Sequence, residues 1–140
     1  MSYWLVKSEP DAWSWEQQVK AGAKGTAWTG VRNHTAKLNL MKMKKGDRAF
    51  FYHSGVGKEI VGVVEIVREH YPDPTDETKK FVAVDLKAVA PVPKPVTLAA
   101  IKAEPRLAEM TLLKQSRLSV PPVTAAEWKL ICAMGGLKGA

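Results

Sequence analysis

A short segment around Trp28 carries the side chains best suited to binding chemistry. The chain reads Ala27-Trp28-Thr29-Gly30-Val31-Arg32-Asn33, and a second polar segment, Lys7-Ser8-Glu9-Pro10, precedes it. An indole offers a flat surface for stacking, while amide, hydroxyl and carboxylate groups can pair with the edge of a base. This combination predicts capture of a single nucleobase taken out of its stack. The alternative is that Trp28 only closes a small core, as most tryptophans do.

The polar residues of these two segments each have a binding and a structural interpretation. Pro10 disfavours helical geometry at Glu9, whose carboxylate either accepts from an exocyclic amino group or is an ordinary surface acid. Arg32 either clamps a phosphate, stacks on a base or forms a structural ion pair. Asn33 either pairs with a base edge or caps the following helix, and the two roles are compatible.

Positive charge is concentrated in the part of the chain that follows Trp28. The formal net charge is +7, and the stretch from Arg32 to Arg48 holds six basic residues opposed only by Asp47. Such a stretch attracts polyanions by Coulomb steering and counterion release. Its position directly after Trp28 favours a nucleic-acid partner over the alternative, an ordinary solvated lysine-rich face.

Composition restricts the class of protein. The 140 residues, 46% of them hydrophobic, fit one globular domain spanning 1–140. No apolar run approaches the roughly 20 residues of a membrane span, and the N-terminus does not resemble a signal peptide, so a cytoplasmic location is the default expectation. The single cysteine, Cys132, lies on an apolar helix face and predicts a buried thiol. No metal site, cofactor or membrane partner is expected.

Several helices are predicted from their capping signals. Ser14-x-x-Gln17 is a capping box that opens a short helix ending near Gly22. Residues 33 to about 44 form a second helix with an apolar stripe, and Thr97 opens a third that Pro105 limits. Thr124-x-x-Glu127 opens the last helix, which Gly135-Gly136 ends.

The strands are predicted from alternation of apolar and polar residues. In the strand expected over 58–69, alternation puts Ile60, Val64 and Ile66 on one face, and the other face is apolar as well. Apolar side chains on both faces fit a strand inside a barrel. Residues 71–76 contain two prolines and are expected to form a loop. The strands expected are 3–7, 48–53, 58–69 and 81–90. The fold class is therefore α+β, a small mixed β-barrel with peripheral helices.

The remaining tryptophans are assigned mainly to packing. Trp4 and Trp15 are core candidates, and Trp128 is expected to point inward with Ile131 and Cys132. Trp13 precedes the Ser14 cap and has the weakest claim to the core, so it is also a candidate for the rim of a site.

Five ordered segments resemble the signature segments of the EVE domain family, and the resemblance runs from residue 3 to about 136, nearly the whole chain. The resemblance implies a PUA-like barrel related to the YTH and ASCH domains, and a function in reading modified bases, particularly modified cytosines in DNA. The segments are Tyr3–Pro10, Trp28–Asn33, Phe51–Ser54, Gly62–Glu65 and Gln115–Val120.

The related YTH domain, which reads methylated adenine in RNA, can be compared residue by residue only in part. Lys7-Ser8 resembles its base-holding Lys-Ser pair, Trp28 the first tryptophan of its aromatic cage, and Thr29 the small polar residue after it. Segment 71–76 offers only Tyr71 where a second tryptophan would be sought. Specificity for N6-methyladenine is therefore not implied.

These residues predict a non-catalytic reader that binds a modified nucleobase in DNA or RNA. Tyr52, His53 and Ser54 end a strand at the expected barrel mouth, where they either line the pocket or only finish a strand edge. Ser116 and Arg117 interrupt an apolar pattern and could clamp the backbone. Base contacts are assigned to Lys7, Ser8, Glu9, Trp28, Thr29, Asn33, Tyr52, His53 and Ser54, and phosphate contacts to Arg32, Lys37, Lys44, Ser116 and Arg117.

Two other functions stay open at this point. His53, Ser54 and Glu9 offer parts of a general-base or nucleophile site, and the related ASCH domains include amidohydrolases. A hydrolase acting on a modified nucleoside is thus one alternative, although the sequence has no nucleophile elbow, metal-ligand spacing or phosphate loop. The other is a protein-interaction module that uses the surface around Trp13.

Overall fold

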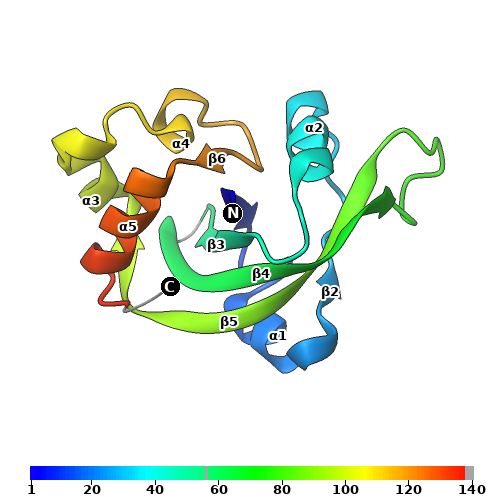
Figure 1. The fold of residues 1–140 in the computed structure, drawn as a ribbon, viewed down its shortest axis with the longest axis horizontal. Coiled ribbons are helices and arrows are strands. Elements are labelled where there is room, and N and C mark those ends of the chain that lie inside the picture. Colours follow the sequence, from blue (N-terminus) through cyan, green and yellow to red (C-terminus); the bar gives the residue numbers. More distant parts are fainter. Residues whose placement is uncertain (56, 138–140) are drawn as a thin grey trace.

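A six-stranded sheet forms the centre of the computed structural model, which describes residues 1–55 and 57–137 (Figure 1). The strand order is β2-β5-β4-β3-β1-β6, with β1 parallel to β3 and the other neighbours antiparallel. The strands are β1 (Tyr3–Ser8), β2 (Thr26–Ala27), β3 (Arg48–His53), β4 (Glu59–Pro72), β5 (Val82–Thr97) and β6 (Pro122–Val123).

Helices cover both faces of the curved sheet, as the predicted α+β class requires. Buried residues of α1 and α2 pack on one face, and those of α3, η2, α4 and α5 pack on the other. In Figure 1, α3 and α5 lie together at the left end of the sheet. Their bounds are α1 (Trp15–Lys20), η1 (Gly22–Lys24), α2 (His34–Lys42), α3 (Leu98–Ala103), η2 (Pro105–Leu107), α4 (Thr111–Lys114) and α5 (Ala125–Met134). None of the helices described is long and apolar enough to cross a bilayer.

Two hydrophobic cores lie on the two faces of the sheet because neighbouring strand residues point to opposite faces. Val6 of β1 and Phe51 of β3 pack in the first core, with residues of α1 and α2. Leu5 and Phe50, one position earlier in each strand, pack in the second core with residues of α3 and α5. As predicted, Trp128 is buried in the second core, where it stacks on Phe50.

The helix starts follow their predicted caps. The Ser14 hydroxyl accepts from Gln17 N at 3.2 Å, and the Gln17 side chain accepts from Ser14 N at 2.8 Å. Thr124 and Glu127 form the same reciprocal pair, and Thr97 caps α3. Cys132 is buried on α5 as expected, and burial raises the pKa of its thiol.

One predicted face assignment in β4 is wrong. Ile60 packs with Val63 in the second core, whereas Val64 and Ile66 pack in the first. Register shifts against β5 occur between Ile60 and Gly62 and between Val63 and Val64. A bulge inserts an extra residue and breaks simple alternation, so residues 60 and 64 no longer share a face.

Both long strands extend further than predicted. β4 includes Tyr71 and Pro72, which pair with Ala83 and Val82, so the expected loop over 71–76 is wrong at its start. β5 continues beyond Ala90 through three alternating prolines to Thr97. Backbone N–H groups of residues two positions apart point to the same edge of a strand, so the three prolines remove donors from one edge only. A strand tolerates this loss on an edge that does not pair with another strand. In this part of β5 the pairing is with β4.

Candidate functional site

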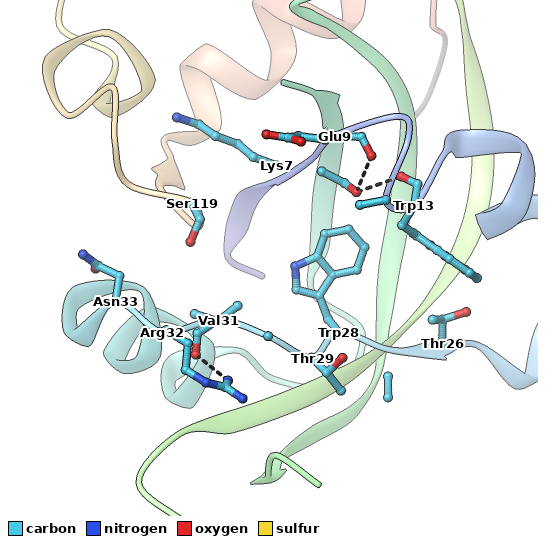
Figure 2. Close-up of a pocket in the computed structure, with 14 residues that line it drawn as sticks. Lys7, Glu9, Trp13, Thr26, Trp28, Thr29, Val31, Arg32, Asn33 and Ser119 are labelled. Carbon is cyan, nitrogen blue, oxygen red and sulfur yellow. Dashed lines mark hydrogen bonds between the residues drawn. The ribbon is translucent and has the colours of Figure 1, made fainter. Parts of the chain in front are cut away.

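A pocket of about 730 Å³ opens where the end of β1 faces the segment that follows β2. Figure 2 shows the lining side chains converging on this hollow from both segments and from Ser119. The lining residues are Lys7, Ser8, Glu9, Ala12, Trp13, Thr26, Ala27, Trp28, Thr29, Gly30, Val31, Arg32, Asn33 and Ser119. Six of the nine predicted base-binding residues are therefore brought together at one site.

Trp28 belongs both to the first core and to the pocket wall. Its backbone N–H donates to Val84 O at 2.7 Å, and its ring meets Phe51 edge to face at 5.7 Å between centroids. The residue is only 8% exposed. Among the described residues its indole N–H has no hydrogen-bond acceptor, and Figure 2 shows the ring nitrogen on the side of Ser119. Trp28 therefore closes a core, as one of the two interpretations expected, and one side of its ring also borders the pocket. Base capture by this ring stays a prediction.

Trp13 supplies a second indole that the sequence had marked only as a rim candidate. Its Nε1–H donates to the Gln18 side chain at 2.9 Å, and the fully buried Gln18 in turn donates to Leu86 O at 3.1 Å. The Ser8 hydroxyl donates to Trp13 O at 2.7 Å. These bonds fix Trp13 against the wall. A second aromatic residue of the pocket wall therefore comes from the turn after β1.

The polar groups of the pocket keep unused hydrogen-bonding capacity. Asn33 accepts from Ala36 N at 2.9 Å through Oδ1, so it caps α2 while its amide NH₂ stays available. Lys7 Nζ donates to Ser116 O at 2.8 Å and, as an ammonium, has further protons; burial lowers the pKa of Lys7. Glu9 is exposed at the pocket edge. The pocket thus presents several donors and one carboxylate acceptor.

Arg32 forms the structural ion pair that the sequence left as an alternative. Its Nη1 lies 3.0 Å from Asp73 Oδ2, and its Nη2 donates to Thr75 Oγ1 at 3.0 Å. The guanidinium also lies over the Phe81 ring at 5.5 Å. The side chain is 40% exposed, and Arg32 is one of the residues that line the pocket.

The prediction that Tyr52, His53 and Ser54 line the pocket is wrong for the described structure. Phe51 points to Trp28, so alternation along β3 turns Tyr52 to the opposite face, where burial raises the pKa of its phenol. His53 Nε2 accepts from Trp15 N at 3.1 Å. Ser54 N donates to Ser8 O at 3.0 Å, which ties β3 to the end of β1.

A smaller hollow of about 340 Å³ adjoins the pocket and shares Asn33 with it. Ser116 and Arg117 both line this hollow, and the bond from Lys7 to Ser116 O connects its wall to the main pocket. Its other lining residues are Thr35, Lys114, Gln115 and Leu118. Two of the predicted phosphate ligands therefore lie next to the predicted base site.

The two remaining lysines lie at different distances from the pocket. Lys37 is one turn into α2, with its Nζ 5.9 Å from the Phe81 ring centroid. Lys44 follows the far end of α2, roughly 15 Å along the helix axis from Asn33. Lys44 is therefore not brought to the pocket. No cluster of three or more metal-ligating side chains occurs in the described part of the chain.

Comparisons with known proteins agree with this architecture. The EVE domain family model matches residues 2–134. An NMR structure of a protein from Rhodopseudomonas palustris has 69% identity and a TM-score of 0.92, covering 97% of this chain and 94% of its own. The human THYN1 protein, solved in complex with DNA containing 5-methylcytosine, has 32% identity and a TM-score of 0.89, covering 99% of both chains.

A more distant likeness supports the PUA-like fold alone. The YTH domain of the Zygosaccharomyces rouxii MRB1 protein, solved with N6-methyladenosine RNA, has a TM-score of 0.60 and 12% identity, covering 99% of this chain and 87% of that one. The match to the family model over almost the whole chain, together with these likenesses, shows that this protein belongs to the EVE domain family.

Proposed function

We propose that this protein is a non-catalytic reader that takes a modified nucleobase of DNA or RNA, such as a modified cytosine, into the Trp28 pocket. The observation that carries the proposal is a tryptophan anchored in a core and exposed to a hollow with hydrogen-bonding groups around it. The complex of human THYN1 with DNA containing 5-methylcytosine supports the same chemistry here.

The pocket walls suit a flat heterocycle with both donors and acceptors on its edge. Aromatic stacking contributes about 1–3 kcal/mol per base, and Trp28 and Trp13 are the rings available for it. The indole N–H of Trp28 and the amide of Asn33 would donate to ring nitrogens or carbonyl oxygens. Glu9 would accept from an exocyclic amino group, as carboxylates do from cytosine N4. Lys7, Ser8 and Thr29 complete the polar edge.

The adjoining hollow would hold the backbone on one side of the extruded base. Arg117 and Ser116 line this hollow, and Asn33 lines both the hollow and the base pocket. Arg32 and Lys37 lie beside Phe81. Contacts to phosphates position a strand without reading its sequence, and they make affinity depend on salt. Lys44 would reach only a strand that continues past α2.

A titration with strands that differ in one base modification tests this function. Short single and double strands with cytosine or 5-methylcytosine at one position, and adenine or N6-methyladenine in a second pair, are followed by the anisotropy of an attached dye. We expect one modified strand to bind more tightly than its unmodified partner. Equal affinities within every pair would reject a reader of modified bases.

Two matched variants separate base reading from charge. Arg117→Ala is expected to weaken modified and unmodified strands alike, because a phosphate contact carries no base information. Lys129→Ala removes an exposed cation from α5, on the other side of the sheet, and is expected to change neither affinity. Selective loss of the modified strand in Arg117→Ala would contradict its phosphate role.

A further inference from the structure

One buried carboxylate in the loop that joins β4 to β5, residues 73–81 (called the arm from here on), contacts the Trp28 segment. Asp73 follows directly after β4, where the arm extends past α2 (Figure 1). The residue is 2% exposed, and its side chain is completely covered. Asp73 does not appear among the residues that line the pocket in the described structure. Any influence of Asp73 on a bound base must therefore pass through its neighbours.

The two carboxylate oxygens of Asp73 face different parts of the chain. Oδ1 accepts from Thr75 N at 2.7 Å and from Thr75 Oγ1 at 2.6 Å, which fixes the side chain to the arm. Oδ2 accepts from Gly30 N at 2.8 Å and from Arg32 Nη1 at 3.0 Å, and both of these residues line the pocket. One side chain thus bridges the arm and the pocket wall.

The bridge meets the wall in a segment that is otherwise held by the packing of Val31 in the first core. Trp28 is anchored by its bond to Val84 O, and Asn33 by its cap on α2. Between them the chain passes through Gly30 at φ +84°, and a Cβ added there would meet nothing within 4 Å. Glycine is therefore needed here for its backbone conformation and not for space. The bonds from Gly30 and Arg32 to Asp73 hold this intervening segment.

We propose that Asp73 is a positioning residue for the base pocket: it fixes Gly30 and Arg32 and so sets the distance between Trp28 and Asn33. This inference rests on the proposed function of the pocket. Burial raises the pKa of Asp73, but hydrogen bonds from Thr75, Gly30 and Arg32 outweigh this and hold it at about 2. The carboxylate therefore stays charged at neutral pH, and bonds to a charged acceptor are the stronger kind.

Asp76 offers a matched control within the same arm. It is also buried, and it accepts from Thr78 N, Thr78 Oγ1, Lys80 N and Phe81 N at 2.6–2.9 Å. All of these partners belong to the arm. Asp73 and Asp76 thus have the same chemistry and similar burial, but only Asp73 bonds to the pocket wall.

The test compares Asp73→Asn with Asp76→Asn by the ratio of affinities for strands with and without the modified base. In Asp73→Asn the amide oxygen can still accept from Thr75. The amide NH₂ group then faces the N–H groups of Gly30 and Arg32, which lose their acceptor. We expect the ratio to fall about tenfold, the worth of a hydrogen bond to a charged group. Asp76→Asn is expected to lower the unfolding temperature while keeping the ratio. An unchanged ratio in Asp73→Asn, or an equal loss in both variants, would overturn the proposal.

Two further measurements keep the outcome decisive. Thr75→Val serves as a second variant if Asp73→Asn does not fold. Thr75 lies outside the pocket, and its hydroxyl bonds to both Asp73 and Arg32, so the variant should also lower the affinity ratio. Hydrogen exchange of the Gly30 amide needs no ligand and should become faster in Asp73→Asn but not in Asp76→Asn. If wild type shows no discrimination, the proposed function fails, and unchanged Gly30 exchange would separately refute the positioning role.

Discussion

Replacing Trp28 by alanine should destabilise the fold strongly as well as alter binding. The residue is 8% exposed, packs edge to face on Phe51 and belongs to the first core. Truncating a buried aromatic residue to alanine costs about 3–5 kcal/mol. Because one side of the ring borders the pocket, water can enter the space left behind. We therefore expect the cost to lie near the lower end, about 3 kcal/mol.

Urea denaturation followed by circular dichroism measures this cost. A loss of about 3 kcal/mol is a large fraction of the roughly 5–15 kcal/mol that stabilises a domain, so the midpoint should fall clearly while the slope m stays constant. Val19→Ala is the control, since Val19 is 50% exposed and its change should stay within about 0.5 kcal/mol. A cost below about 1 kcal/mol for Trp28→Ala would refute the placement of the indole in the core.

A gentler substitution isolates the binding role of Trp28. Trp28→Phe keeps an aromatic ring against Phe51 but removes the indole N–H that has no acceptor among the described residues. We expect discrimination between modified and unmodified strands to fall by roughly five- to tenfold, the worth of about one hydrogen bond. Unchanged discrimination in a well-folded Trp28→Phe would show that the N–H does not contact the base.

Three further outcomes follow from particular contacts. Lys37→Ala should weaken all strands alike and reduce the slope of log affinity against log salt by about one, and selective loss for one base would contradict this. Gly62→Ala places a Cβ 2.4 Å from the Trp15 ring, so urea unfolding should show a loss of about 1–3 kcal/mol, and a neutral effect would refute tight packing there. The pKa of Asp73 lies at about 2, below its ordinary 3.8, so its carboxylate stabilises the fold above pH 3.8, and this contribution disappears as the pH falls through 2. The unfolding temperature of wild type should therefore fall more steeply between pH 4 and pH 2 than that of Asp73→Asn, and parallel curves would contradict the shift.

Features determined by neighbouring residues could be predicted from the sequence. The caps at Ser14, Asn33, Thr97 and Thr124 form bonds to residues three positions away, so a local pattern is sufficient to find them. The inward face of α5 with Trp128 follows from helical periodicity for the same reason. The two segments that form most of the pocket wall were also identified from residue types.

Features that depend on strand pairing could not be predicted. The bulges that move Ile60 to the face of Val63 arise from the register with β5, which alternation along one strand does not contain. The face of Tyr52 follows from the direction of Phe51 towards Trp28. Ser119 reaches the pocket from a segment more than eighty residues away, and Asp73 bonds to Gly30 across 43 positions. Neither residue was predicted as a site residue, although Ser119 lies in the signature segment Gln115–Val120.

The most direct measurement records the indole N–H resonances of ¹⁵N-labelled protein during titration with the strand that binds most tightly. Trp28 and Trp13 line the pocket, while Trp4 donates to Asp47 and Trp128 is buried in the opposite core. We expect the Trp28 and Trp13 resonances to shift in proportion to the bound fraction, while those of Trp4 and Trp128 stay in place. Saturation of binding with an unmoved Trp28 resonance would contradict base capture in this pocket.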